Sequence, residues 1–435
     1  MNLRKQGVGC WGVLHLAGVV LLGSNLFAGE PAQDWPAFRG PWGNGQTHFS
    51  QLPLHWGETD NVRWKTPIPH EGWSTPVVMD GQVWVSSATP DGHDFHAFCL
   101  DAETGRMRFE KHLFHSDTPE PLGNSVNGYA SPSPVIESGR VYIHFGSYGT
   151  ACLDTATGEV LWKRDDLPCR HYRGPGSSAI LYEELLILTF DGVDQQYVTA
   201  LDKHTGKTVW RTDRNIEWDD LNENGQPKMD GDFRKAFATP LVIQIGGKDQ
   251  LVSLASSAMF AYDPRTGREI WKVRHHGHSS SVSPVFSKGL VLATTGYRTV
   301  ELWAIRPDGT GDVTDTHVAW RFASKDVPTT PSPVVMDDLV IMTSNKGTLT
   351  CLETETGKTV WRERIGGNHL ASPVSDGDRI YLFSVNGKTS VARAGRTFEE
   401  LAENQLESGF MASPAVVGKA LFLRTKTYLY RIEEN

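Results

Sequence analysis

The sequence contains few cysteines, and no two of them are adjacent. The 435 residues include five, at positions 10, 99, 152, 169 and 351, and no pair has the CxxC spacing. This excludes a disulfide-rich scaffold, a zinc ribbon and a CxxCH haem attachment. A single disulfide between Cys99 and Cys152 stays open, because the sequence does not give the distance between the two side chains.

Basic residues are also in the minority. The chain has 42 Lys and Arg against 51 Asp and Glu, which gives a formal net charge of −9. A nucleic-acid partner is therefore not expected, because binding to phosphate requires a basic face. Hydrophobic residues make up 39% of the chain and aromatic residues 10%. This is enough for a buried core and excludes a disordered chain.

Long hydrophobic runs are missing after Ala28, so no integral membrane span is expected in the mature chain. Before that point, Arg4 and Lys5 precede an apolar stretch from Val8 to Leu22, and small residues follow. This layout predicts a signal peptide over residues 1–28, with an uncleaved anchor as the alternative. We therefore expect an exported protein of the periplasm or cell envelope.

The common catalytic signatures are missing too. No GxSxG, HExxH or GxxxxGK[ST] occurs, so no catalytic residue is predicted. A calcium-like string begins at Asp220, but Gly231 stands where such a loop needs a bidentate glutamate, which favours a polar turn. His276 and His278 would share one face of a strand. A third ligand would have to come from another repeat, such as His369, and no metal site is predicted.

What the chain does contain is one unit that recurs throughout. An apolar strand ends at an acidic residue, Thr-Gly follows, and an aromatic residue comes four positions after the glycine. Five copies share this spacing, from Gly105 with Phe109 to Gly357 with Trp361. Thr-Gly makes a tight reversal in which glycine supplies a positive φ, so each unit predicts a β-hairpin.

A second element precedes each hairpin. It is a Ser-Pro-Val-like opening, as in STPVV at 74–78 and ASPAV at 412–416, and a turn leads from it to a partner strand. Each repeat therefore has four strands. Eight openings leave about 46 residues per repeat, within the roughly 40–50 that a four-stranded blade needs. We predict an all-β fold for residues 61–435, an eight-bladed β-propeller of four-stranded antiparallel blades.

The last repeat lacks an outer strand of its own. It stops after residues 428–432, and NVRWK at 61–65 has the character of the missing strand. Strands from the two ends of the chain would then share one blade and leave no free sheet edge. Residues 29–60, which include DWPAFRGPWGNG, lie outside the ring. They are expected to form an ordered strap packed on the propeller.

The Ala-x-Asp-x-x-Thr-Gly-x-x-x-Trp unit, as at 200–210 and 261–271, resembles the tryptophan-docking motif of pyrroloquinoline quinone (PQQ) dehydrogenases, which are eight-bladed propellers. It is equally similar to the repeat of BamB-type propellers, which carry no cofactor. The DWPAFRGP start and GFMASPAV at 409–416 resemble secreted bacterial PQQ-like propeller proteins. The recurring aromatic residues would then stack between neighbouring blades; they are Trp64, Phe109, Trp162, Trp210, Trp271, Trp320 and Trp361.

In a propeller, the connections before the inner strands surround the mouth of the central channel. Here they carry aromatic side chains together with His and Arg, which suit a flat anionic ligand through stacking and charge-assisted hydrogen bonds. Ordinary funnel lining without a ligand is the alternative. The candidate ligand-binding residues are Trp73, Tyr129, His171, Tyr172, Arg173, Phe237, His276, His278, His369 and Phe410.

The leading interpretation is an exported, non-catalytic binding or scaffolding propeller of the bacterial cell envelope. Its partner would be an envelope protein or a small anionic ligand, and no cofactor is expected. The alternative is a PQQ-dependent dehydrogenase of alcohols or sugars that holds PQQ with calcium. The resemblance implies a ring of two adjacent cysteines over the quinone in such enzymes, and this sequence lacks that pair.

Overall fold

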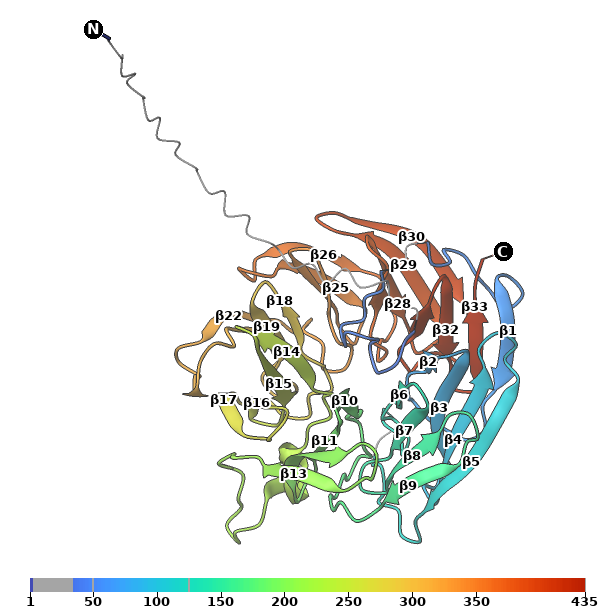
Figure 1. The fold of residues 1–435 in the computed structure, drawn as a ribbon, viewed down its shortest axis with the longest axis horizontal. Helices are drawn as coiled ribbons and strands as arrows, with labels where there is room; N and C mark the ends of the chain where they lie inside the picture. The colour runs from blue at the N-terminus through green and yellow to red at the C-terminus, as the bar shows by residue number, and fades with distance from the viewer. Residues whose placement is uncertain (3–33, 49–50, 124–125, 435) are drawn as a thin grey trace. The chain divides into compact units, whose positions relative to one another are not determined.

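The computed structural model describes residues 1–2, 34–48, 51–123 and 126–434. The predicted signal peptide lies outside the described residues, apart from its first two. Residues 32–435 form one compact unit, and its strands make eight separate sheets arranged in a ring (Figure 1). The predicted eight-bladed β-propeller is confirmed.

Each blade contains four antiparallel strands in one sheet, which in blade 4 is joined by a short fifth strand, and we number the blades along the chain. Blade 1 contains β2 (Val77–Met79), β3 (Gln82–Ala88), β4 (Asp94–Asp101) and β5 (Met107–His115). Blade 2 contains β6 (Val135–Glu137), β7 (Arg140–His144), β8 (Thr150–Asp154) and β9 (Val160–Arg164). Blade 3 contains β10 (Ile180–Tyr182), β11 (Leu185–Asp191), β12 (Gln196–Asp202) and β13 (Thr208–Asp213). Blade 4 contains β14 (Leu241–Ile245), β15 (Lys248–Leu254), β16 (Ala258–Tyr262) and β17 (Glu269–Arg274).

The second half of the ring repeats this order. Blade 5 contains β18 (Val285–Ser287), β19 (Leu290–Thr294), β20 (Glu301–Ile305) and β22 (Val318–Ala323). Blade 6 contains β23 (Val334–Met336), β24 (Leu339–Thr343), β25 (Thr348–Glu353) and β26 (Thr359–Arg364). Blade 7 contains β27 (Val374–Ser375), β28 (Arg379–Phe383), β29 (Lys388–Ala394) and β30 (Phe398–Gln405). Blade 8 contains β31 (Ala415–Val417), β32 (Ala420–Arg424), β33 (Tyr428–Ile432) and β1 (Val62–Pro67).

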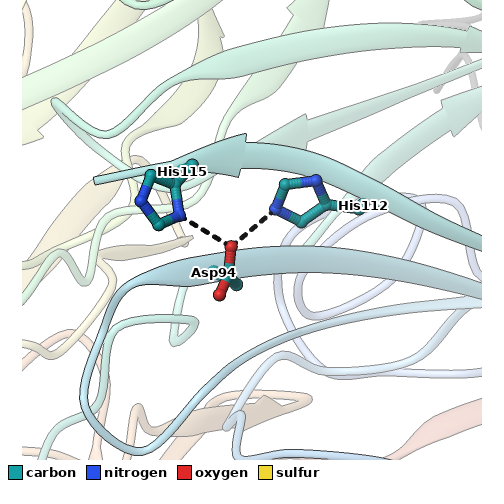
Figure 2. Close-up of side chains that lie close together, drawn as sticks. All are labelled: Asp94, His112 and His115. Atoms are coloured by element: carbon teal, nitrogen blue, oxygen red, sulfur yellow. Dashed lines mark hydrogen bonds and ion pairs between the residues drawn. The ribbon is translucent and has the colours of Figure 1, made fainter. Parts of the chain in front are cut away.

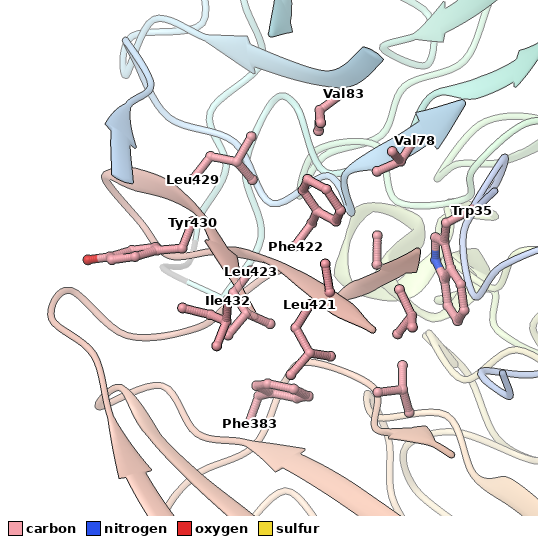
Figure 3. Packing of buried hydrophobic residues seen from close by; sticks show 14 of the residues in the cluster. Trp35, Val78, Val83, Phe383, Leu421, Phe422, Leu423, Leu429, Tyr430 and Ile432 are labelled. Carbon is pink, nitrogen blue, oxygen red and sulfur yellow. The ribbon is translucent and has the colours of Figure 1, made fainter. Parts of the chain in front are cut away.

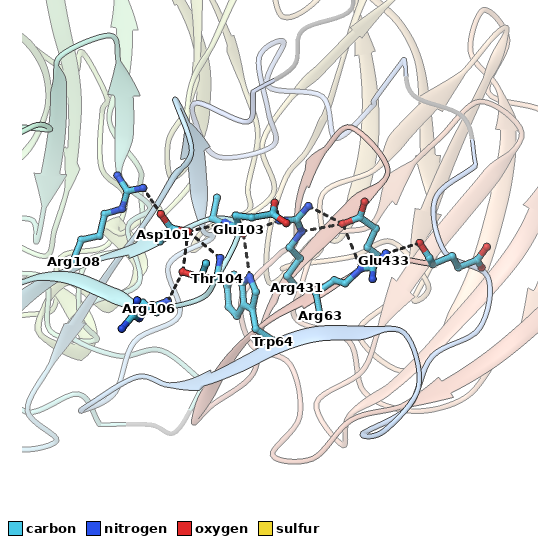
Figure 4. Close-up of polar contacts among 11 residues, drawn as sticks. Arg63, Trp64, Asp101, Glu103, Thr104, Arg106, Arg108, Arg431 and Glu433 are labelled. Carbon is cyan, nitrogen blue, oxygen red and sulfur yellow. Dashed lines mark hydrogen bonds and ion pairs between the residues drawn. The ribbon is translucent and has the colours of Figure 1, made fainter.

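Blade 8 closes the ring with strands from both ends of the chain. β1 pairs antiparallel with β33, with Thr66 opposite Leu429, as the sequence predicted. Two side chains then hold this blade to blade 1: Trp64 Nε1 donates to Ala102 O at 3.0 Å, and Arg431 Nη1 donates to the same oxygen at 3.1 Å (Figure 4). The first and last strands of the propeller therefore pair with each other rather than ending as free edges.

In five blades the recurring aromatic residue docks on the Thr-Gly turn of the next blade; these residues are Trp64, Phe109, Trp162, Trp210 and Trp320. Trp361 of blade 6 donates to Gly395 O of blade 7 at 2.8 Å, where no Thr-Gly turn occurs. Trp162 Nε1 donates to Lys203 O at 3.0 Å, and its ring covers Gly206, where an added Cβ would lie 2.7 Å from the indole. Gly206 has φ +71°, and Asp202 Oδ1 accepts the Thr205 N–H at 2.8 Å. The acidic residue of the repeat thus caps the turn. The glycine has no Cβ, so the indole can approach the turn closely.

Trp271 of blade 4 also departs from this pattern. Its Nε1 donates to Gln250 Oε1 of its own blade at 2.8 Å. The facing turn in blade 5 is replaced by a longer excursion that contributes β21 (Gly311–Asp312), and β21 pairs parallel with β17. This extra strand covers Trp271, which is fully buried.

A ring of hydroxyls ties the inner strands together near the channel. One Ser or Thr stands just before each inner strand, and at six joints the backbone N–H of one donates at 2.9 Å to the hydroxyl of the next. Because each of these six joints uses a backbone donor, the hydrogen bonds fix the register between neighbouring inner strands. The eight residues are Thr75, Ser133, Ser178, Thr239, Ser283, Ser332, Ser372 and Ser413.

The N-terminal segment, residues 34–48, lies across the inner strands. Trp35 exchanges two backbone hydrogen bonds with Val78 of blade 1, at 2.8 and 2.9 Å, and Ser375 of blade 7 donates to Gly45 O at 2.9 Å. Trp35 is 1% exposed and belongs to the core cluster shared by blades 7, 8 and 1 (Figure 3). Arg39 is also buried, and it donates to Pro333 O of blade 6 at 2.5 Å.

Cys99, Cys152, Cys169 and Cys351 are free and buried, so no disulfide joins Cys99 to Cys152. Burial raises the pKa of the Cys99 thiol to about 12, which keeps it protonated and unreactive at neutral pH. The described residues include one 3₁₀ helix, η1 (Lys228–Arg234), between blades 3 and 4. Among the described residues, no helix is long and apolar enough to cross a membrane.

Candidate functional site

A cavity of about 410 Å³ lies where the inner strands begin. All eight blades or their entry connections contribute to its lining, so the cavity is the mouth of the central channel. Phe38 of the N-terminal segment joins the lining from outside the ring. The lining residues are Phe38, Trp73, Val126, Asn127, Ser131, Ser133, Arg173, Gly176, Ser178, Asp232, Phe237, Thr239, His278, Ser279, Ser281, Tyr297, Thr330, Leu370, Ser372, Met411 and Ser413.

Hydroxyls of the inner-strand ring form the neck of this cavity. Five of the eight line it: Ser133, Ser178, Thr239, Ser372 and Ser413. Each accepts a backbone N–H from the preceding blade. A hydroxyl used as an acceptor still has its own O–H donor. In the neck, the backbone hydrogen bonds hold the hydroxyl groups in place, and their O–H groups can donate hydrogen bonds to an oxygen-rich ligand.

Three long connections bring polar side chains to the rim. Residues 116–134 carry Asn127, residues 165–179 carry Arg173, and residues 214–240 carry Asp232 within η1. Loops on a rigid scaffold are the usual position of binding residues. The rim is therefore built mainly by the entries to blades 2, 3 and 4.

The charges at the rim are coupled. Arg173 Nε donates to Asp232 Oδ1 at 3.1 Å, and Lys235 Nζ donates to the same oxygen. Burial alone would raise the pKa of Asp232, yet the hydrogen bonds from Lys235 and Arg173 outweigh it and lower that pKa. Burial lowers the pKa of Lys235. Two cations on one carboxylate leave a local surplus of positive charge, which favours an anionic partner.

Aromatic side chains surround this cluster. Lys235 Nζ lies 5.0 Å from the ring centre of Tyr172. His278 packs edge-on against Phe233 at 5.0 Å and stacks on Tyr297 at 6.2 Å. Burial lowers the pKa of His278, so it stays neutral at pH 7. The rim thus offers stacking faces beside a positive centre.

The rim also exposes large apolar side chains. Val126 is 50% exposed, Met229 of η1 67% and Tyr297 46%. Val126 and Tyr297 belong to the cavity lining, and Met229 lies three residues from Asp232. Exposed apolar groups gathered around a polar depression are typical of a protein-binding surface.

Four of the ten candidate residues line the cavity, namely Trp73, Arg173, Phe237 and His278. Tyr172 lies beside them, beneath Lys235. Ligand binding by these residues stays a prediction.

The other candidates point elsewhere. Both nitrogens of His369 are engaged with backbone carbonyls at 2.9 Å, and Phe410 packs on Phe383. Tyr129 donates to Glu120 O, and the buried His171 accepts the Ser147 N–H at 3.0 Å. His276 is exposed to solvent. A residue in the connection before an inner strand can face the blade core as readily as the channel, and all of these side chains except that of His276 are buried.

Most of the lining was not among the sequence candidates, and three of the missed residues show why. Asn127 lies in a long connection, Met411 directly follows Phe410, and Phe38 belongs to the N-terminal segment. Only the position of Met411, next to a candidate, carried a usable signal. The path of residues 34–48 across the ring depends on long-range pairing, which no local pattern reveals.

Neither metal pattern of the sequence assembles in the described part of the chain. Asp220 is bound in a fork by Arg234, at 2.7 and 2.8 Å, and Asn222 Oδ1 accepts the Asn224 N–H as in a polar turn. His276 and His278 do not join a third ligand. A different group, Asp94 with His112 and His115, does meet the geometry of a metal site among the described residues.

A quinone with calcium does not fit this cavity. Calcium takes six to eight oxygen ligands, usually with several carboxylates. Among the residues lining the cavity the only carboxylate is that of Asp232, which two cations already engage. None of the buried cysteines lines the cavity. We therefore derive no redox step at this site.

Known proteins with similar sequences agree with this architecture. The family described as outer membrane protein assembly factor BamB matches residues 57–212 and 194–435. The outer membrane protein assembly factor BamB of Shewanella oneidensis is 25% identical over 270 residues. That match spans 61% of this chain and 62% of the relative, so it leaves more than a third of the relative's length unmatched.

Solved structures show the same fold at low identity. BamB from Moraxella catarrhalis superposes with a TM-score of 0.57 at 13% identity, covering 85% of this chain and 99% of that one. A quinohaemoprotein alcohol dehydrogenase from Comamonas testosteroni gives a TM-score of 0.64 at 12% identity, covering 93% and 81%. Because an assembly factor and an alcohol dehydrogenase share the fold, these likenesses concern architecture alone.

Proposed function

Because the chain belongs to the family of outer membrane protein assembly factor BamB, we propose that it is an exported, non-catalytic binding propeller of the bacterial cell envelope. It holds a protein partner at the mouth of its central channel. The membership also supports a place on the periplasmic side of the envelope. The proposal accounts for the predicted export and for the absence of catalytic motifs in the sequence.

The observation that carries the proposal is the rim of the cavity. It combines exposed Val126, Met229 and Tyr297 with the surplus positive charge of Arg173 and Lys235 around Asp232. Apolar anchors beside one desolvated charge are typical of the energetic centre of an interface. We infer that the partner presents an apolar segment with an acidic side chain or carboxylate.

Site-specific photocrosslinking in the envelope tests this function. A photoreactive phenylalanine derivative at Tyr297 should form an adduct with one defined envelope protein. The same derivative at Leu161, which is 46% exposed on blade 2, serves as the matched control and should form none. Arg173→Gln should weaken the Tyr297 adduct. Equal adducts at both positions, or none at Tyr297, would reject the channel mouth as the binding site.

The enzymatic alternative has its own assay. Purified protein is incubated with PQQ and calcium, and the quinone absorbance and dye-linked oxidation of alcohols or sugars are followed. We expect neither a spectral shift nor oxidation, because the cavity lacks an unengaged carboxylate. Turnover that depends on PQQ would replace the binding function with a dehydrogenase.

A further inference from the structure

A second group of functional side chains lies on blade 1, apart from the channel mouth. Asp94 Oδ1 lies 2.8 Å from His112 Nε2 and 2.8 Å from His115 Nδ1, and the three ligand atoms all lie within 4.8 Å of one another (Figure 2). We propose that Asp94, His112 and His115 form a binding site for a divalent transition metal of the zinc class. This goes beyond the proposed function and does not depend on it.

The three donor atoms suit such an ion. Zinc binds imidazole nitrogen and carboxylate oxygen at about 2.0–2.2 Å, which places tetrahedral donors about 3.4 Å apart. The present separations, from 2.8 Å up to 4.8 Å, bracket that value, so small side-chain rotations are enough to admit the ion. Three protein ligands would leave one position for water or for a side chain of another molecule.

A β-bulge is what brings the two histidines together. Residues three apart on a regular strand point to opposite faces, and His112 and His115 of β5 would not meet. The register shifts so that Phe95 pairs with Phe114 and His96 with His112, which leaves Leu113 as the extra residue. Leu113 and Phe114 are consequently both buried, and the two histidines share the exposed face. Bulges commonly re-aim side chains in this way.

A second carboxylate lies beside the three proposed ligands and could support one of the histidines. Asp117 Oδ1 lies 3.3 Å from His115 Nε2, the ring nitrogen that does not face Asp94. A metal-bound imidazole typically donates its second N–H to a carboxylate, which fixes the ring and strengthens the ligand. Asp117 therefore occupies the position of that supporting group. Two carboxylates beside two imidazoles also give the site the negative charge that a divalent cation favours.

The site is open to solvent, so an ion can enter and exchange. The side chains of His112, His115 and Asp94 are 51%, 52% and 37% exposed. Asp94 opens β4 and His115 ends β5. In an antiparallel blade both positions lie at the end where the inner strand begins. The site thus faces the same side of the ring as the channel mouth.

Titration calorimetry of the full chain without a histidine tag, using Zn²⁺ alone, tests the site. We expect one saturable ion per chain. His112→Gln and His115→Gln should each weaken binding at least tenfold, and the double variant should abolish it. Asp117→Asn should weaken it tenfold to a hundredfold, as is usual for outer carboxylates. His204→Gln is the control, because exposed His204 also pairs with a carboxylate, Glu184, at 2.6 Å.

A spectroscopic readout separates ligation from adsorption. Co²⁺ in place of Zn²⁺ should give a visible band of a four- or five-coordinate ion in the wild type and in His204→Gln, and the band should vanish in the double variant. Circular dichroism checks that each variant is folded. Absence of saturable Zn²⁺ binding would overturn the proposal. Binding that survives in the double variant would overturn it as well.

Discussion

Asp191 and Arg214 form a buried ion pair that holds two blades together. The carboxylate accepts two hydrogen bonds from the guanidinium, at 2.6 and 2.8 Å, and both side chains are fully buried. Arg214 also donates to Ser253 Oγ of blade 4 at 2.8 Å. The pair therefore joins blade 3, which carries Asp191, to its neighbour.

Arg214→Met should lower the free energy of unfolding by about 3–5 kcal/mol, because it leaves a buried carboxylate without its partner. Arg393→Met is the control: that side chain is 52% exposed beside Asp378, and its loss should cost less than about 1 kcal/mol. Chemical denaturation measures both. A loss below 1 kcal/mol for Arg214→Met would show that Asp191 finds other partners or is protonated.

Single residues were also where sequence reasoning reached its limit. The residue types at the channel mouth were predictable, but side-chain direction was not: Trp73 faces the cavity, whereas His369 turns to two carbonyls. The histidine pattern drew attention to His276 and His278. The group that meets at Asp94 depends on a bulge at Leu113, and a bulge changes the two-residue periodicity on which such a prediction rests.

At the scale of the element, the repeated hairpin was predictable because its determinants are local. An acidic residue caps the turn, glycine adopts a positive φ, and the aromatic residue follows at a fixed distance, as in Asp202, Gly206 and Trp210. The excursion in blade 5 was visible only as a departure from the pattern. Its pairing as β21 with β17 and the resulting cover on Trp271 depend on contacts between blades, which no local spacing encodes.

Two glycines allow the docking of the indole to be measured apart from backbone strain. Both Gly206 and Gly139 have a positive φ, +71° and +81°. A Cβ on Gly206 would lie 2.7 Å from the ring of Trp162, whereas one on Gly139 would meet nothing within 4 Å. Gly139→Ala should cost about 1–2 kcal/mol for the backbone alone.

Gly206→Ala should cost about 1–3 kcal/mol more than Gly139→Ala, because the docked indole must also move. Denaturant titration of the two variants gives the difference directly. In addition, the fluorescence of Trp162 should shift only in Gly206→Ala. Equal losses would mean that the indole packs on the turn without constraining it.

For the whole molecule, buried neutral histidines set the response to acid. Burial lowers the pKa of His144 to about 3, of His171 to about 4 and of His275 to about 3. In the unfolded chain their pKa is about 6.5. Because the unfolded chain then binds protons that the folded protein does not, stability is complete above pH 6.5 and is lost as the pH falls toward 4.

Each of the three groups should remove about 1.4 kcal/mol of stability per pH unit in that window. Denaturation at pH 7.5, 6 and 5 measures the slope, above the range where carboxylates titrate. His144→Gln should reduce the slope by about 1.4 kcal/mol per pH unit, whatever its effect on stability at pH 7.5. A slope unchanged in that variant would show that His144 does not remain neutral in the folded protein.

The closure of the ring, where β1 pairs with β33 in blade 8, should be its weakest joint, because in every other blade the four strands follow one another in the sequence. Trp64 and Trp210 are both 9% exposed, and each donates to a carbonyl of the next blade. Trp→Ala at either position should therefore cost a similar 3–5 kcal/mol locally. In blade 3 the chain runs directly from β12 to β13, which carries Trp210, whereas β1 and β33 of blade 8 are separated in sequence by almost the whole chain.

Trp64→Ala should consequently let β1 detach from β33. Limited proteolysis should then cut first near residues 61–67, and the exposed edge of β33 should promote association of folded molecules. Trp210→Ala should lose stability without either effect. The Arg424 side chain, which reaches Ser86 O of blade 1 at 2.8 Å, holds the joint from the inner side, so detachment should begin at the outer strand. If both variants are cut at the same sites, the pairing of β1 with β33 is as strong as the pairing of strands that follow one another in the sequence.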